Sequence, residues 1–154
     1  MTENEATPGS TPIDVVIPVK FGAGFLPQAL RSIAAQRCSA TVFVVDDGAD
    51  VDVAELVDSV GSELAAASVT VEVLPNAGHP GIGGARNTGV GAGSAALVAF
   101  VDADDLWVDG RHALLLAALG DVSTPSMAFG LVEQFVDADG VHTALDEPHR
   151  RAMV

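Results

Sequence analysis

Four short runs of apolar, largely β-branched residues recur along the first two thirds of the chain, and this recurrence limits its fold more than any other feature. Two of them, Ile13–Val19 and Thr41–Val45, read as strands buried on both faces. A sheet made of such strands needs a helical layer on each side. The predicted strands are Ile13–Val19, Thr41–Val45, Val69–Leu74 and Ala96–Val101.

Segments with helical periodicity separate these runs. In the first, Leu26, Leu30 and Ile33 fall at i, i+4 and i+7 and share one face. Asp50 or Asp52 is available as the N-cap of the second. The predicted helices are Phe25–Gln36, a helix from Val53 that keeps its period through Val57, Val60 and Leu64, and a small-residue helix Ala85–Ser94.

Strands that alternate with helices favour βαβ crossovers and a parallel sheet. The predicted fold class is therefore α/β, doubly wound and Rossmann-like, with a mostly parallel sheet and helices on both faces. Ligands of such sheets bind at the carboxyl ends of the strands. Two acidic clusters occupy that position, Asp46-Asp47 and Asp102 to Asp105.

The ends of the chain have weaker patterns. Residues 1–11 are polar and contain Pro8 and Gly9, so we expect a disordered tail followed by one domain over 12–154. After Trp107 the sequence suggests further elements with less regular patterning. They are a helix Ala113–Leu119, a strand Met127–Val136, a turn Asp137–Gly140 and a hairpin with the residues from Val141 onward.

The charge balance narrows the choice of partners. With 21 acidic and 7 basic residues the net charge is -14, which repels nucleic acid, and a diphosphate ligand would need a cation between it and the carboxylates. Cys38 is the only cysteine, the first residues do not resemble a secretion signal, and no apolar run approaches the roughly 20 residues that span a bilayer. We expect a cytoplasmic protein, with any membrane association peripheral.

The densest acidic cluster has two interpretations. Asp102, Asp104 and Asp105 follow an apolar strand, and three carboxylates so close repel one another unless solvated, protonated or bound to a cation. Mg²⁺ or Mn²⁺ would relieve the repulsion and share its other positions with water and phosphate oxygens. A solvated acidic turn that caps the next helix is the alternative. Spacing alone does not favour either.

Six blocks, taken in order, resemble the signatures of family 2 glycosyltransferases. The resemblance covers about Ile13 to Trp107 and implies a GT-A fold, the Rossmann-like fold that binds a nucleotide-diphospho-sugar. The blocks are Ile17-Pro18-Val19, Ala29-Leu30-Arg31-Ser32-Ile33 with Gln36, Val44-Val45-Asp46-Asp47-Gly48, Asn76-Ala77-Gly78, Ala85-Arg86-Asn87-Thr88-Gly89 and Phe100-Val101-Asp102-Ala103-Asp104-Asp105-Leu106-Trp107.

The resemblance assigns roles to particular residues. It implies that Pro18 lines the nucleotide cleft and that Asp47, with Asp46, hydrogen-bonds the base, for which a uracil-type edge is suitable. Asp102-Ala103-Asp104 corresponds to the DxD motif, with Asp104 on Mg²⁺ or Mn²⁺ and Asp102 on the ribose or the metal.

Residues outside these two motifs remain open. Arg86 either contacts the phosphates or forms a structural ion pair with Asp46, Asp47 or Asp102. Trp107 either borders the sugar or anchors the packing. His79 is expected to be a loop residue.

The reaction implied by the resemblance is inverting transfer of a hexose to an unknown saccharide, lipid or protein acceptor. It needs a general base for the acceptor hydroxyl, and no residue is assigned to it, although Glu133, Asp137 and Asp139 are acidic. The sequence also departs from the family pattern at Lys20-Phe21, where an aromatic residue and Asn are common. Residues 12–107 thus correspond to the nucleotide-sugar-binding half and 108–154 to an incomplete acceptor half.

Several other functions compete with this interpretation. A nucleotide-sugar-binding module without turnover fits the missing base. A dinucleotide-binding loop at Gly78–Gly93 lacks the G-x-G-x-x-G spacing and follows the third predicted strand instead of the first. A phospho-receiver domain lacks the downstream Lys, since Lys20 is the only lysine. An exposed apolar patch near an incomplete acceptor half would favour a homo-oligomer.

Overall fold

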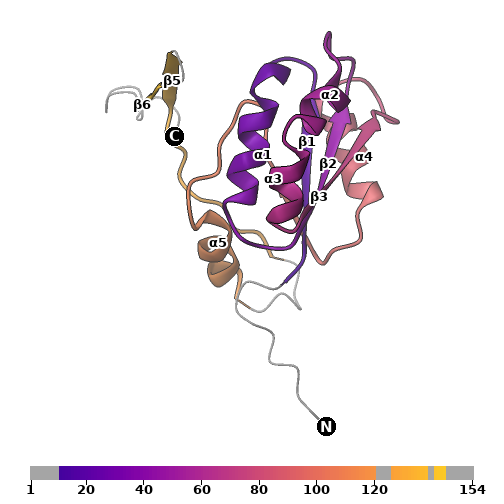
Figure 1. Cartoon of the computed structure of the whole chain (residues 1–154). Helices are drawn as coiled ribbons and strands as arrows, with labels where there is room; N and C mark the ends of the chain where they lie inside the picture. The colour runs from indigo at the N-terminus through magenta and orange to yellow at the C-terminus, as the bar shows by residue number, and fades with distance from the viewer. Residues whose placement is uncertain (1–10, 121–125, 139–140, 145–154) are drawn as a thin grey trace.

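The computed structural model describes residues 11–120, 126–138 and 141–144. Its centre is a four-stranded parallel sheet with the order β3-β2-β1-β4 (Figure 1). The strands are β1 (Ile13–Val19), β2 (Ala40–Asp46), β3 (Val69–Pro75) and β4 (Leu97–Phe100). All four predicted strands are confirmed, with bounds that shift by one residue or less.

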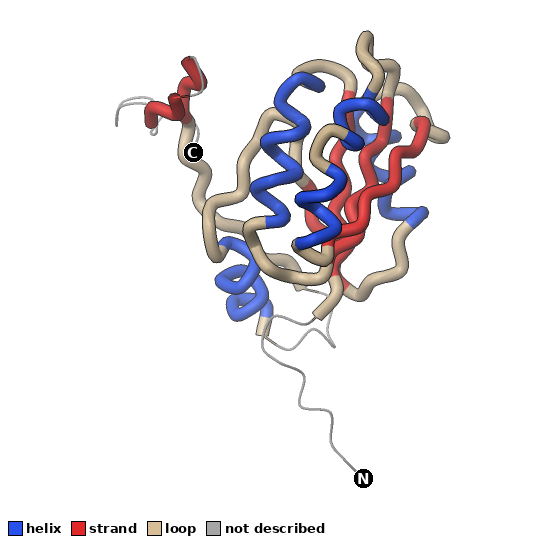
Figure 2. The backbone as a smooth tube through the Cα atoms, in the orientation of Figure 1, coloured by secondary structure: helices blue, strands red, loops and turns tan. Residues whose placement is uncertain are grey.

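Helices cover both faces of this sheet, as predicted. Figures 1 and 2 show α1 (Leu26–Ala34) and α3 (Gly61–Ala66) on one face and α4 (Ile82–Ala92) on the other. The remaining helices are a short 3₁₀ turn η1 (Ala23–Phe25), α2 (Val53–Asp58) and α5 (Arg111–Leu119).

The two-residue period of β1 determines which of its side chains face each part of the core. Val15 and Ile17 are fully buried and belong to the large cluster that α1, α2 and α3 cover. Val16 points the other way and packs with Val45 and Ala85 of α4. Since both faces of β1 are closed, the run Ile13–Val19 contains almost no polar residue. Leu26, Leu30 and Ile33 of α1 are fully buried, which confirms the predicted face.

Two sequence-based predictions are wrong in detail. The helix expected from Val53 through Leu64 is two short helices, because the chain turns at Ser59 and Val60 before Gly61 opens α3. The small-residue helix begins at Ile82 instead of Ala85. Asp52 is the N-cap that the sequence offered, and its side chain accepts a hydrogen bond from the Glu55 amide at 3.1 Å.

The strand expected over Met127–Val136 is also mostly wrong. Residues 126–134 have no regular structure, and only β5 (Phe135–Ala138) is extended and paired, antiparallel to β6 (Val141–Ala144). Met127, Phe129 and Leu131 are more than four-fifths exposed, so no neighbouring strand holds them. The hairpin is confirmed, while Asp139 and Gly140 of its turn and the tail over 1–10 lie outside the described residues. None of the described helices has the length and hydropathy of a bilayer span.

Candidate donor-binding site

The predicted site residues gather where the strands of the main sheet end. Parallel strands deliver their carboxyl ends to one edge of a sheet. Val19 at the end of β1 is in register with Asp46 at the end of β2, and the Asp47 amide donates to the Val19 carbonyl at 2.8 Å. Pro18 therefore lies one residue from this edge. Asp102 to Asp105 follow the neighbouring strand β4.

Asp46 organises the turn after β2. Its Oδ1 accepts hydrogen bonds from the amides of Gly48 at 2.9 Å and Ala49 at 2.8 Å. Gly48 has φ of +90°, a conformation that favours glycine. Asp46 therefore holds the turn itself. A contact between Asp46 and a base stays a prediction.

Asp47 ties three segments together and is almost buried, with 7% of its side chain exposed. Its carboxylate accepts from Asn76 Nδ2 at 2.6 Å and from the Gly81 amide at 2.8 Å, and Lys20 Nζ lies 3.8 Å away. The Asn76 hydrogen bond is the main reason why the pKa of Asp47 is lowered. The carboxylate is therefore ionised at neutral pH. It fixes the loop between β3 and α4 against the end of β2.

That loop is closed by its own small residues. Asn76 Oδ1 accepts from the Gly78 amide at 2.9 Å and from Thr88 Oγ1 at 3.1 Å, which joins the loop to α4. At Gly84 an added Cβ would stand 1.8 Å from the His79 carbonyl oxygen, so only glycine fits there. His79 contributes this carbonyl, which also accepts from Asn76 at 3.1 Å. The expectation that His79 serves only the loop agrees with these contacts.

Arg86 forms an ion pair with Asp102. Its Nη2 lies 2.9 Å from Asp102 Oδ1, and the two side chains are 37% and 44% exposed. The guanidinium also lies over the ring of Phe100, with 5.4 Å between Cζ and the ring centroid. Its Nε is buried without a hydrogen-bond partner. Of the ion pairs that the sequence allowed for Arg86, the structure forms the one with Asp102 and leaves donor capacity on the guanidinium.

The acidic segment Asp102 to Asp105 alternates between the core and the surface. Ala103 is 3% exposed within the main core cluster, so Asp102 and Asp104 turn outward on either side of it. The Asp105 amide donates to the Asp102 carbonyl at 3.0 Å and closes a tight turn. Burial first, and then the charges of Asp102 and Asp104, raise the pKa of Asp105. The three carboxylates are thus near enough to repel one another.

This arrangement suits a shared cation better than an ion caged by protein alone. In the part of the chain that the structure describes, no three or more His, Cys, Asp or Glu residues are grouped so that they could hold a metal ion. Mg²⁺ needs only one or two carboxylates when water and substrate phosphates complete its shell. The outward carboxylates of Asp102 and Asp104 meet that lesser requirement.

Polar groups of α1 and of the residues just after it hold the chain that follows the acidic segment, and the sequence analysis gave these groups no role. Ser32 Oγ accepts from the Trp107 amide at 3.0 Å. The Gln36 side chain accepts from the His112 amide and donates to the Val108 carbonyl, both at 3.0 Å. Ser32 and Gln36 stand in the second of the six blocks, which was the available signal. Trp107 itself is 6% exposed within the main core cluster, so it is a packing anchor.

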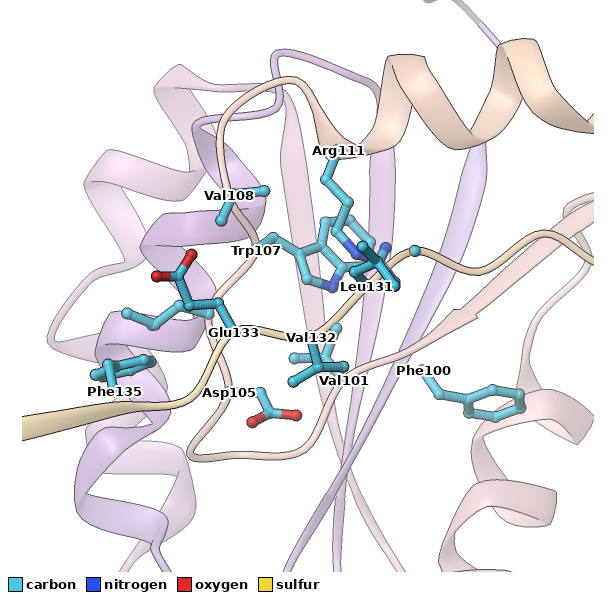
Figure 3. Close-up of a pocket in the computed structure, with 12 residues that line it drawn as sticks. Phe100, Val101, Asp105, Trp107, Val108, Arg111, Leu131, Val132, Glu133 and Phe135 are labelled. Carbon is cyan, nitrogen blue, oxygen red and sulfur yellow. The ribbon is translucent and has the colours of Figure 1, made fainter. Parts of the chain in front are cut away.

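Two cavities of the described chain lie beside this edge. One of about 390 Å³ is lined by Asp105, Trp107 and Arg111 together with the segment around Leu131 and Val132 (Figure 3). The Arg111 guanidinium stacks on the Trp107 ring at 4.6 Å. Asp46, Asp47, Arg86 and Asp104 do not line it. The predicted donor residues therefore lie outside this cavity.

The parallel sheet with helices on both faces is the fold of GT-A glycosyltransferases, as superposition on solved structures shows. A mannosyltransferase from Pyrobaculum calidifontis, solved with GDP-Man and Mn²⁺, superposes with a TM-score of 0.61 at 22% identity, over 71% of this chain and 32% of that one. Staphylococcus aureus TarS 1-349 in complex with UDP-GlcNAc superposes with a TM-score of 0.53 at 26% identity, over 70% of this chain and 30% of that one. The fold predicted from the sequence is thus confirmed.

Residues 14–124 match the model of Glycosyl transferase family 2, and the chain belongs to that family. The pre-mycofactocin glycosyltransferases of two Mycobacterium tuberculosis strains, CDC 1551 / Oshkosh and ATCC 25618 / H37Rv, are 34% identical over 156 residues. The match covers 96% of this chain and 30% of each relative. The chain therefore spans about a third of the length of the curated relatives it matches.

Proposed function

We propose that this chain is the donor-binding part of a family 2 glycosyltransferase and that it holds a nucleotide-diphospho-sugar at the carboxyl edge of its sheet. The observation that carries the proposal is the convergence at one edge of the Asp47 network, the Arg86–Asp102 ion pair and the outward Asp104. In this proposal residues 12–107 form the donor half. Residues 108–154 belong to the acceptor half.

The nucleoside would lie against the ends of β1 and β2. Pro18 provides an apolar wall, and Asp47 with Asp46 presents carboxylate oxygens that accept from base N–H groups. Asp47 already accepts from Asn76 and Gly81, so its geometry is set before any ligand arrives. A uracil edge supplies one N–H to such an acceptor. We therefore expect UDP-sugars to be preferred.

The diphosphate would lie between α4 and the acidic segment. The Arg86 guanidinium, which is 37% exposed beside Asp102, would donate to phosphate oxygens there, because a planar guanidinium forms strong charge-assisted hydrogen bonds with phosphate. Asp104, with Asp102, would hold Mg²⁺ or Mn²⁺, and the ion would neutralise charge on the departing nucleoside diphosphate. By pairing with Asp102, Arg86 also holds that carboxylate in place. The small side chain of Ala103 lets the segment pack on the core.

The proposed reaction is inverting transfer of a hexose to a saccharide, lipid or protein acceptor. A general base must take the acceptor proton, and no described residue is assigned to this role. The acidic surface and charge of -14 make nucleic acid an unsuitable acceptor. We propose a cytoplasmic location, free or peripheral to a membrane.

A second candidate is a nucleotide-sugar-binding module without turnover, which the absence of an assigned base favours. Both candidates bind donor, so binding does not separate them. Release of UDP from UDP-glucose or UDP-GlcNAc, with water as the acceptor, would separate them. A slow metal-dependent release above that of the Asp104→Ala variant supports the enzyme, and its absence supports the module.

Calorimetric titration with UDP, with and without Mn²⁺, tests the site itself. We expect binding that needs Mn²⁺ and is lost in Asp104→Ala, while Asp58→Ala, an exposed carboxylate on α2, removes the same charge without effect. Arg86→Met should weaken binding by about 10- to 100-fold, the loss of one charge-assisted hydrogen bond worth about 1.5–3 kcal/mol. The proposed metal site would be refuted if UDP bound equally well with and without Mn²⁺ and equally well to the parent and to Asp104→Ala. The same titration with GDP in place of UDP tests the expected preference for a uracil nucleotide.

A further inference from the structure

Lys20 is the first residue after β1 and the only lysine of the chain. Val19, the last residue of β1, is in register with Asp46 of β2, and the Asp47 amide donates to the Val19 carbonyl at 2.8 Å. Lys20 and Asp47 therefore leave two neighbouring strands side by side. Their side chains meet, with 3.8 Å between Lys20 Nζ and Asp47 Oδ2. The carboxyl edge of the sheet thus places a cation next to an anion.

The two side chains of this pair differ in exposure. The Asp47 side chain is 7% exposed, and Asn76 donates to its Oδ1 at 2.6 Å while the Gly81 amide donates to its Oδ2 at 2.8 Å. A carboxylate has about four acceptor sites, so each oxygen keeps one. The Lys20 side chain is 44% exposed. The carboxylate is therefore held in place, while the ammonium on its Oδ2 side is open to a ligand.

The contacts of the ammonium leave its N–H donors available. The 3.8 Å between Lys20 Nζ and Asp47 Oδ2 is longer than a hydrogen bond between nitrogen and oxygen. Lys20 Nζ also lies 5.9 Å from the centroid of the Phe21 ring, a cation–π contact that occupies no particular N–H. An ammonium group has three donors and no acceptor. Lys20 can therefore donate to a ligand but cannot accept a hydrogen bond from one.

A donor beside an acceptor distinguishes two classes of nucleotide base. Uracil and guanine each have a ring N–H next to a carbonyl, which matches a carboxylate beside an ammonium. Cytosine and adenine have the reverse at the same positions, a ring nitrogen without hydrogen next to an amino group. A carboxylate that faces the bare nitrogen and an ammonium that faces the amino group are both repelled. The pair formed by Lys20 and Asp47 therefore suits the first class of base and opposes the second.

We propose that Lys20, acting with Asp47, selects the base of the donor and favours uracil and guanine nucleotides over cytosine and adenine nucleotides. Lys20 donates to the base carbonyl, and Asp47 accepts from the neighbouring N–H. This inference rests on the proposed function, since it concerns the base of the same donor. The aromatic residue that the family commonly has at this position can stack on a base, but every base has a π face, so stacking alone does not make this distinction.

Two other roles of the Lys20 ammonium would give a different experimental result. It would act on the diphosphate if it only attracted negative charge, and it would act within the protein if it only neutralised Asp47. In both cases its removal changes the affinity for every nucleoside diphosphate by the same factor, because all of them carry the same phosphates. Selection of the base instead changes the ratio of affinities between nucleotides. That ratio is therefore the quantity to measure.

The test is calorimetric titration of the full chain with UDP, CDP, GDP and ADP, each in the presence of Mn²⁺. We expect UDP to bind about tenfold or more tightly than CDP, and GDP to exceed ADP by a similar factor, because an amino base leaves the ammonium unpaired. Comparing bases of equal ring size removes differences in stacking area. Equal affinities for UDP and CDP would overturn the inference and leave the proposed function standing. If none of the four bound, both would be refuted.

Variants of Lys20 assign the preference to this side chain. Lys20→Gln offers both an N–H and a carbonyl, so the ratio of UDP to CDP affinity should fall to about threefold or less. Lys20→Arg still only donates and should keep the preference for UDP. Arg37→Gln removes one positive charge from an exposed residue before β2 and should leave all four affinities unchanged.

Equal melting temperatures of the two Lys20 variants would show that the fold is intact. A loss of affinity in Lys20→Gln by the same factor for UDP and CDP, with the ratio of the parent retained, would overturn the proposed role of Lys20. The comparison of UDP with CDP on the parent chain does not depend on the folding of either variant.

Discussion

Replacing Gly89 by alanine should destabilise the protein although it improves helix propensity. Gly89 lies in α4, where the helix crosses β1, and an added Cβ would stand 2.4 Å from Val16 Cγ1 and 2.9 Å from Val16 Cγ2. Val16 is fully buried and packs with Val45 and Ala85, so it has little freedom to withdraw. The helix and the strand must therefore separate.

The change in the free energy of unfolding can be estimated by comparison with Gly91, a second glycine of the same helix. At Gly91 an added Cβ has no atom within 4 Å. Gly91→Ala should therefore stabilise the protein by up to about 1 kcal/mol, the difference in helix propensity. Gly89→Ala gains the same amount but overpacks the interface, at a cost of about 1–3 kcal/mol. The free energies of unfolding of the two variants should thus differ by about 1–3 kcal/mol.

Urea unfolding followed by far-ultraviolet circular dichroism measures both free energies by linear extrapolation. A third protein, Val16→Ala with Gly89→Ala, provides the internal check. Removing two methyl groups makes room for the new Cβ, so the double variant should be more stable than the sum of the single effects predicts, by about 0.5 kcal/mol or more. Equal stabilities of Gly89→Ala and Gly91→Ala, or strict additivity with Val16→Ala, would refute this packing argument.

Three further outcomes follow from the structure. Because burial lowers the pKa of His112 below 6.5, the unfolded chain binds more protons, and stability should fall as the pH drops below about 6.5; urea unfolding of His112→Phe should show less of this loss. The lowered pKa of Asp47 affects stability at more acidic pH. Its carboxylate stabilises the folded state above pH 3.8, and this stabilisation is lost as the pH falls below that value. Asp47→Asn should therefore be less stable than the parent at pH 7 and should lose less stability on acidification. Gly22→Ala should cost about 1–2 kcal/mol because φ is +70°, yet its Cβ would meet Asp104 at an ordinary 3.5 Å, so Mn²⁺-dependent UDP titration should be unchanged.

The strands of the sheet were predictable because their physics is local. A run such as Thr41–Val45 has no polar residue to place in water, so it has to lie inside a sheet with both faces covered. The helix from Val53 shows the limit of this reasoning. Val57, Val60 and Leu64 are all buried as their period predicts, although the helix breaks between them. Periodicity reports which side chains face the core, and not whether the backbone stays helical.

The predicted strand Met127–Val136 is mostly wrong for a different reason. Its residues have strand-like composition, but a strand exists only where a neighbour accepts its hydrogen bonds, and no local pattern shows whether that neighbour is present. In the described chain, residues 126–134 have no regular structure and form no ladder with β4. Composition alone could not show that these residues stay outside the main sheet, in which β4 is the last strand of the described chain.

The location of the candidate site was predictable, but most of its contacts were not. The rule for parallel sheets places Asp46, Asp47 and Asp102 at one edge without any knowledge of side chains. The bond from Asn76 to Asp47 joins residues 29 apart, and only the folded chain reveals it. For Arg86 the sequence offered several carboxylate partners, and three-dimensional packing selected Asp102.

The hydrogen bonds from Ser32 and Gln36 to the chain after the acidic segment have a consequence for the order of folding during synthesis. Ser32 and Gln36 bond to Trp107, Val108 and His112, partners that lie 75, 72 and 76 residues further along the chain. A nascent chain can assemble β1, β2 and β3 well before those partners leave the ribosome. Until they do, Asp102 to Asp105 have no anchor on the helix. Under the proposed function, the donor site would therefore be completed late, when the emerging chain reaches α5, and not gradually as the sheet grows.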